Sequence, residues 1–363
     1  MSQLLERLED RLRLEIDPTS RAEVVARRAC YLARVGRFEE SRRDITDVRQ
    51  LFGDGRSGRV TIFVMIAEAL CLHFERLEHG AVDRVLRAQL LAQAMKDREL
   101  TALTSAWRAH LAFEASDFEL VNRSLHTAFQ NASEADHSAL SRCAIVLLNG
   151  FALCGDREQS QSWFLKGRHH ALAEGDQAAL DALLHSRAAF GTAWLRTRRC
   201  QGAVEPAELA RMGREISSAR NLQHLTQVTA HAQYIDLCDA RLQLVEGKYE
   251  SAIKILMLLR NSGPFPEGHF NKELVDLELG YCRLMLRREG AEIPPAQPVK
   301  FQQHAFDRLD IDDQLFAAWL YLEMANASGH ERELAEERLA KATVAYREWL
   351  DRLQRCLAEH RAS

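Results

Sequence analysis

The chain has 363 residues, of which 47% are hydrophobic and 28% are charged, the balance of a folded protein rather than a disordered one. Its formal charge of -4 provides no general attraction to nucleic acid or to anionic membranes. We therefore expect neither a direct nucleic-acid partner nor a membrane partner.

Three features bear on the compartment. The first residues, MSQLLERLEDRLRLE, carry acidic side chains throughout and lack the apolar centre of a secretory signal. The most apolar run, from Val60 to Leu72, is too short to span a bilayer and contains Glu68. The eight cysteines are scattered singly with no C-x-x-C pair, which favours free thiols in a reducing compartment. We expect a cytoplasmic protein.

Helix-forming residues dominate the chain. No proline occurs between Pro18 and Pro206, and Ala, Leu, Arg and Glu are abundant. Apolar residues recur at three- and four-residue steps, as at Ile253, Leu256 and Leu259, and no convincing alternating strand is present. The pattern predicts an all-α fold.

One short phrase occurs twice, as GRFEES from Gly36 and as GKYESA from Gly247. It predicts a turn between antiparallel helices, because glycine can adopt the left-handed conformation that ends a helix. Similar turns recur at intervals of roughly 40 residues, which predicts about seven helix pairs. The predicted turns lie at Gly36, Gly80, Ser116, Gly155, Gly202, Gly247 and Gly290.

The rest of the phrase fits the same geometry. An aromatic residue follows two positions after the turn, at Phe38, Phe118 and Tyr249. A residue of modest size follows three positions after the aromatic residue, and another lies seven positions before the turn. Both are expected where the two helices cross closely. These are Ser41, Val121 and Ala252 after the turn, and Ala29, Ala109 and Ala240 before it.

With this combination of small residue, turn glycine and aromatic, the chain resembles the tetratricopeptide-repeat family. Its units exceed the usual 34 residues and are similar to the longer helical repeats of bacterial signalling regulators. The resemblance implies a right-handed TPR-like α-solenoid of about seven antiparallel helix pairs with a long C-terminal helix. It also implies a concave surface, formed mainly by the first helix of each pair, that binds a protein or peptide.

Placing the family's inward-facing positions on this sequence gives a candidate binding surface. The positions are Arg27, Cys30, Arg34, Trp107, His110, Phe113, Arg142, Asn149, Tyr234, Leu237 and Arg241, and all but Cys30 and Leu237 are the predicted binding residues. Aromatic residues and arginines are enriched in binding hot spots. Alternatively, Trp107, Phe113 and Leu237 simply pack between helices.

The repeat array is predicted to occupy residues 1–289, followed by a proline-rich connector at 290–300 and C-terminal helices at 301–363. The last helix, from Glu331 to about His360, has an apolar seam. This seam is expected either to cap the array or to form a homodimer contact. It comprises Ala335, Leu339, Ala342, Tyr346, Trp349, Leu353 and Cys356.

No phosphate-binding glycine loop, G-x-S-x-G or H-E-x-x-H motif occurs in the sequence. We therefore expect no enzymatic activity, no cofactor and no metal site. The favoured hypothesis is a non-catalytic scaffold or sensor that binds a protein or peptide. The alternative is a regulatory protein of transcription or nucleotide signalling that acts through a partner.

Overall fold

The computed structural model describes residues 2–53, 55–76, 80–226, 232–261, 272–292, 306–328 and 331–361. Throughout these ranges the regular structure is helical and no strand occurs, so the all-α prediction is confirmed. None of the helices in this part of the chain is long and apolar enough to cross a membrane.

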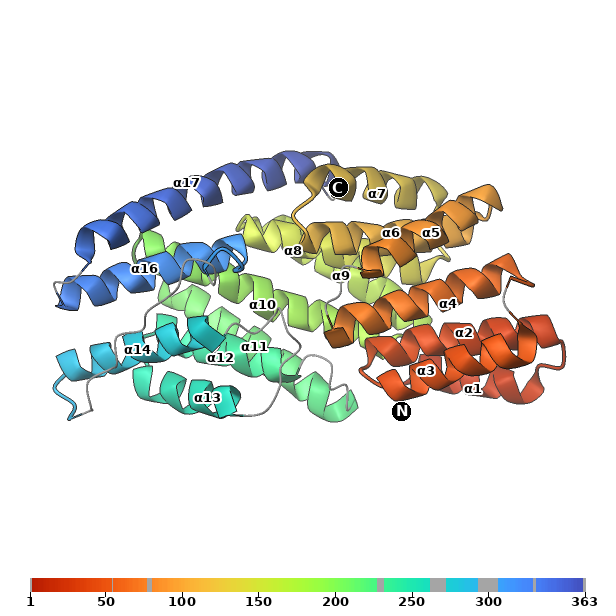
Figure 1. The fold of residues 1–363 in the computed structure, drawn as a ribbon, viewed down its shortest axis with the longest axis horizontal. Helices are drawn as coiled ribbons and strands as arrows, with labels where there is room; N and C mark the ends of the chain where they lie inside the picture. The colour runs from red at the N-terminus through yellow and green to blue at the C-terminus, as the bar shows by residue number, and fades with distance from the viewer. Residues whose placement is uncertain are drawn as a thin grey trace.

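The N-terminal half forms one end and the centre of an elongated molecule (Figure 1). Its helices are α1 (Gln3–Leu14), α2 (Pro18–Arg34), α3 (Phe38–Asp47), α4 (Gly58–Cys71), α5 (Gly80–Ala94), α6 (Arg98–Glu114), α7 (Phe118–Asn131), α8 (His137–Leu153) and α9 (Arg157–Glu174). Two π-helical turns, Val48–Phe52 and Leu72–Arg76, extend α3 and α4.

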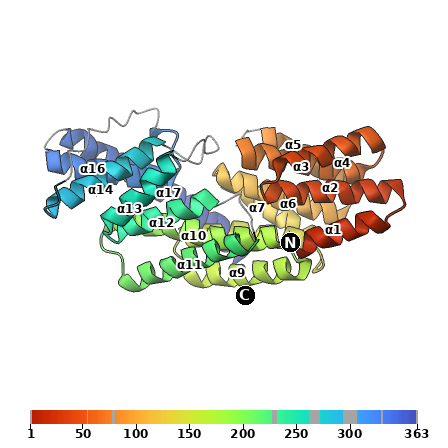
Figure 2. The same ribbon diagram turned by 90° about the horizontal axis from the view of Figure 1, so that it is seen from below.

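The C-terminal half starts with a long helix that crosses the middle of the molecule and then builds the other end (Figure 2). Its helices are α10 (Gln177–Gln201), α11 (Pro206–Thr226), α12 (Ala232–Val245), α13 (Tyr249–Asn261), α14 (Lys272–Arg288), α16 (Ile311–Ser328) and α17 (Arg332–Leu357). Helices that follow one another in sequence mostly pack together. In addition, α2 packs on α4, α6 on α8, α8 on α10 and α10 on α12.

The repeated phrase forms the predicted turn. Gly36 and Gly247 have φ angles of 84° and 81°, in the left-handed region where glycine meets no steric penalty. After Gly36, the Arg37 N–H donates to the Leu32 carbonyl at 2.9 Å, closing the end of α2. The same pairing closes the helix ends at Ser116, Gly155, Gly247 and Gly290. The turns at Gly36, Ser116, Gly155 and Gly247 each lie between two consecutive helices, as predicted.

Small residues lie where the paired helices cross. Ala29 and Ser41 are fully buried, and the Ser41 hydroxyl donates to the Ala29 carbonyl at 2.9 Å. Ala240 and Ala252 are likewise fully buried in the later pair. Larger side chains at these positions would separate the helices, which explains why the phrase keeps small residues there.

The first helices contact the middle of the chain. The Leu4 N–H donates to the carbonyl of Gly175, in the turn between α9 and α10. Arg34 at the end of α2 pairs with Asp176, the N-cap residue of α10. The first helix pair is therefore fixed to the start of α10, more than a hundred residues away in sequence.

The terminal helix crosses the molecule from α16 to α7 (Figure 1). On its seam, Leu353 is fully buried, and the Trp349 indole N–H donates to the Ser116 hydroxyl at 2.9 Å. The seam is thus covered by the same chain, and it joins two distant parts of the molecule. Residues 293–300 of the predicted connector lie outside the described residues.

Candidate binding site on the inner helices

The apolar members of the predicted binding surface are buried. Trp107 is 3% exposed and Phe113 is 6% exposed, and the Phe113 ring packs on the rings of Phe118 and Phe190. Leu237 is also buried. Burial of all three side chains is what the alternative interpretation, packing between helices, expects. Phe113 and Leu237 therefore contribute to the core.

Arg27 belongs to a charged network that connects α2, α4 and α6. Its guanidinium lies 3.0 Å from Glu99 and 2.9 Å from Glu23. Arg59 of α4 pairs with both of these carboxylates and with Asp97. The charge of Arg27 is thus already neutralised within the chain.

Arg241 belongs to a second network, at the opposite end of the molecule. Its Nε donates to the buried Glu278 carboxylate at 2.9 Å, and Nη1 lies 3.5 Å from Asp313. Arg196 of α10 pairs with Asp313 and with Asp312, at 3.0 Å from the latter. This network connects α10, α12 and α14 to the start of α16.

Two other predicted residues occupy separate positions. The Tyr234 ring of α12 lies 6.0 Å from the His185 ring of α10. Asn149 of α8 is 3% exposed, and its Oδ1 accepts no hydrogen bond from the residues that the structure describes.

Arg34 and Arg142 differ in their partners although little of either residue is exposed. The Arg34 Nη2 donates to both oxygens of Asp176, at 2.6 and 2.5 Å. Arg142 of α8 is 4% exposed and makes neither a hydrogen bond nor an ion pair with any described residue. Burial, reinforced by the positive charge of Arg34, lowers the pKa of Arg142 to about 9.

The Arg142 guanidinium is packed against an aromatic face. Its central carbon lies 3.9 Å from the centre of the Trp107 ring. The His110 ring also contacts Trp107, edge to face, with 5.6 Å between the ring centres. The structure therefore brings together Arg142, Trp107 and His110 of the predicted surface, whereas Arg27 and Arg241 lie in separate networks.

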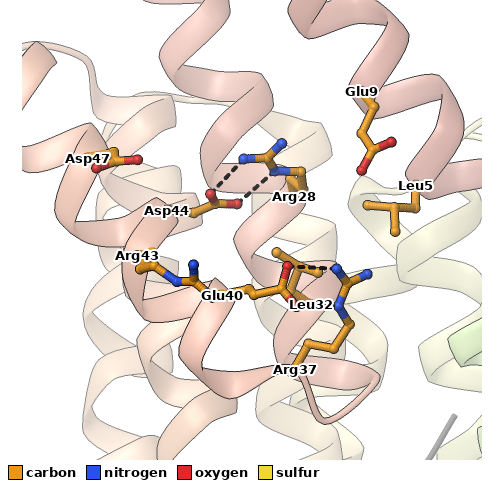
Figure 3. Close-up of a pocket in the computed structure, with 9 residues that line it drawn as sticks. All are labelled: Leu5, Glu9, Arg28, Leu32, Arg37, Glu40, Arg43, Asp44 and Asp47. Carbon is orange, nitrogen blue, oxygen red and sulfur yellow. Dashed lines mark hydrogen bonds and ion pairs between the residues drawn. The ribbon is translucent and has the colours of Figure 1, made fainter.

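A surface pocket of about 260 Å³ lies between α1, α2 and α3 (Figure 3). Charged side chains dominate its lining, and four of them form two ion pairs. Arg28 donates to both oxygens of Asp44 at 2.8 and 2.7 Å, and Arg37 pairs with Glu40 at 2.6 Å. Both arginines of these pairs therefore have a carboxylate partner, unlike Arg142.

Sequence reasoning missed two side chains that lie near Arg142, Trp107 and His110. Glu114 lies one helical turn after His110 on α6, and its charge acts on Arg142. His73 comes from the π-helical turn after α4. The four-residue spacing of His110 and Glu114 was a detectable signal, because it places two polar side chains on one helix face. Nothing in the sequence indicates that His73 would join them.

No protein-family model matches the chain, and no curated protein matches its sequence.

Proposed function

We propose that the chain is a non-catalytic interaction module of the tetratricopeptide-repeat type that binds an acidic segment of a protein partner. In this proposal the helix pairs form a right-handed array of about seven units. The recurrent turns at Gly36, Ser116, Gly155 and Gly247, together with the small residues at the helix crossings, support the repeat assignment.

The observation that carries the proposed function is the guanidinium of Arg142, which pairs with no carboxylate among the described residues. A buried charge without a directly paired counter-charge is costly, and burial has already lowered the pKa of Arg142. A carboxylate from a partner would supply the missing counter-charge and the planar acceptor geometry that arginine prefers. Binding of a carboxylate is therefore favoured, because it offsets the unfavourable free energy of the buried Arg142 charge in the free protein.

Trp107 adds a second element of recognition. Its ring fixes the plane of the guanidinium from one side, which limits how many orientations a carboxylate can adopt. Tryptophan and arginine are both typical of binding hot spots. Since only 4% of Arg142 is exposed, the ligand must be narrow, such as one acidic side chain or the carboxylate at the end of a chain.

Capture from a native lysate tests the proposal. The bait is the full chain, compared with a double variant carrying Trp107→Phe and Arg142→Gln, which removes the charge with little loss of volume. The matched control is Arg123→Gln, which removes one positive charge from an exposed position on α7.

We expect the wild-type chain and Arg123→Gln to capture the same protein, and the double variant to lose it while its circular dichroism spectrum is unchanged. Equal capture by the folded double variant would reject the assignment of this site.

A further inference from the structure

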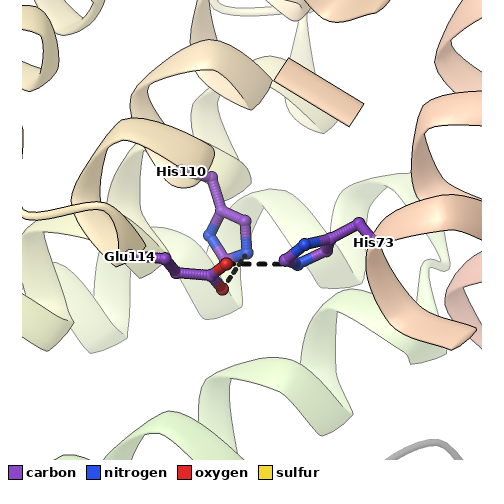
Figure 4. Close-up of side chains that lie close together, drawn as sticks. All are labelled: His73, His110 and Glu114. Atoms are coloured by element: carbon purple, nitrogen blue, oxygen red, sulfur yellow. Dashed lines mark ion pairs between the residues drawn. The ribbon is translucent and has the colours of Figure 1, made fainter. Parts of the chain in front are cut away.

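Three side chains with metal-binding atoms meet between α4 and α6. His73 comes from the π-helical turn after α4, whereas His110 and Glu114 come from the last turns of α6 (Figure 4). One ligand atom from each residue lies within 4.8 Å of the other two. All three side chains point toward a common centre.

The distances from the two histidines to the Glu114 carboxylate are close to those between neighbouring ligand atoms of a metal site. His73 Nε2 lies 3.5 Å from Glu114 Oε2, and His110 Nε2 lies 3.4 Å from Glu114 Oε1. Tetrahedral zinc with bonds of about 2.0–2.1 Å places neighbouring ligand atoms about 3.3–3.4 Å apart. Small side-chain rotations would therefore bring the two imidazoles and the carboxylate onto one ion.

The backbone at His73 is also unusual. From Leu72 to Arg76 the chain forms a π-helical turn in place of the α-helix that precedes it. Such turns are rare and occur frequently at functional sites, because they reorient side chains that a regular helix would direct elsewhere. Here the turn holds the His73 ring 5.7 Å from the His110 ring.

The surroundings favour binding of an ion over hydration of the separate side chains. His73 and His110 are 6% and 9% exposed. The Phe74 ring lies 4.6 Å from His73, and the Trp107 ring lies 5.6 Å from His110. An apolar shell of this kind restricts solvent access to a metal site. The Glu114 side chain is 35% exposed and leaves a path for the ion to enter.

We propose that His73 Nε2, His110 Nε2 and one carboxylate oxygen of Glu114 bind a divalent transition metal, foremost zinc. Two imidazoles and a carboxylate suit zinc and leave a fourth position for water or another oxygen ligand. This proposal does not depend on the proposed binding of an acidic segment, since it concerns different side chains.

The test is zinc titration of the full chain after removal of metals by a chelator. Free zinc is followed with a chromophoric competitor, and cobalt is then added to report coordination by its visible absorption. We expect one zinc ion per chain, cobalt bands of low-symmetry four-coordinate type, and a higher unfolding temperature with zinc.

Two variants remove ligands and one serves as a control. His110→Gln and Glu114→Gln are each expected to weaken zinc binding at least tenfold and to abolish the cobalt bands. The control is His137→Gln, because His137 and His170 also have ring nitrogens 3.0 Å apart but belong to no such three-ligand group among the described residues. This variant should bind zinc like the wild type.

Zinc binding that persists unchanged in both ligand variants, or that is lost in His137→Gln alone, would overturn the assignment. So would a wild-type chain that binds no zinc in competition with the chromophore. Circular dichroism of each variant without metal establishes that it is folded, and Glu114→Gln, with its partly exposed side chain, provides the test if His110→Gln fails to fold.

Discussion

The guanidinium of Arg142 lies against the Trp107 ring, with 3.9 Å between its central carbon and the ring centre, and has no carboxylate partner among the described residues. Arg34, whose side chain is 11% exposed, has such a partner in Asp176. One arginine is paired with a carboxylate and the other is not. Substituting them should therefore affect the free energy of unfolding differently.

We expect Arg34→Met to lower the free energy of unfolding by about 3–5 kcal/mol, because it leaves the Asp176 carboxylate buried without its counter-charge. Arg142→Met should leave the free energy of unfolding unchanged or raise it by about 1 kcal/mol, since it removes an unpaired buried charge. Urea unfolding of both variants measures the difference. Equal destabilisation by the two substitutions would show that Arg142 is paired in solution.

Asp181 of α10 should make the free energy of unfolding depend on pH. Its side chain is 1% exposed, one carboxylate oxygen has no hydrogen-bond partner in the described part of the chain, and burial raises its pKa from 3.8 to about 7. The folded state therefore favours the neutral acid. The stability contributed by Asp181 is complete below the unfolded pKa and is lost as the pH rises through the folded pKa of about 7.

Asp181→Asn should remove this dependence. The difference in free energy of unfolding, variant minus wild type, should grow by up to about 4 kcal/mol as the pH rises from about 4 to 8. This follows from 1.36 kcal/mol for each unit by which the pKa is raised. Urea unfolding of both proteins at several pH values gives this difference and cancels the titration of other groups. A constant difference over the whole range would contradict the assigned pKa.

The turns between helix pairs should differ in their tolerance of a side chain. Gly247→Ala is expected to lower the free energy of unfolding by about 1–2 kcal/mol, because alanine is strained in the left-handed conformation. No steric clash adds to this, since the nearest atom to the added Cβ would be 3.8 Å away. Gly155→Ala should cost more, since its Cβ would lie 2.5 Å from the Trp194 indole nitrogen. Thermal unfolding of the two variants tests the order, and a reversed order would contradict the observed packing at Gly155.

Helix α17 should act through contacts within one chain. Leu353→Ala removes a fully buried side chain and is expected to cost about 2–5 kcal/mol, whereas Leu334→Ala, at a position 48% exposed, should change stability by less than about 0.5 kcal/mol. Both variants should sediment with the same mass as the wild type. A change of mass in Leu353→Ala, with the fold retained, would instead indicate that the seam joins two copies.

The turns could be predicted from sequence because their determinants are local. A glycine, an aromatic two positions later and a small residue further on are sufficient to end one helix and start the next, as at Gly36 and Gly247. The course of α17 could not be predicted, because the contact between Trp349 and Ser116 joins residues more than two hundred positions apart.

The candidate site was predictable only in part, for a similar reason. The positions carried over from the tetratricopeptide-repeat resemblance assigned Trp107 and Arg142 to the same surface. Only the fold shows that they touch and that Asp176 pairs with Arg34 and not with Arg142. His73 could not be predicted at all, because its position depends on the π-helical turn after α4.

The most direct test of the central claim is a binding cycle between Arg142 and the acidic group of the captured partner. Calorimetry compares the partner segment with a copy in which the acidic group is replaced by its neutral amide, each titrated into the wild type and into Arg142→Gln. We predict at least tenfold weaker binding of the neutral segment to the wild type and no such difference for Arg142→Gln. An equal preference for the acidic segment in both proteins would contradict recognition by Arg142.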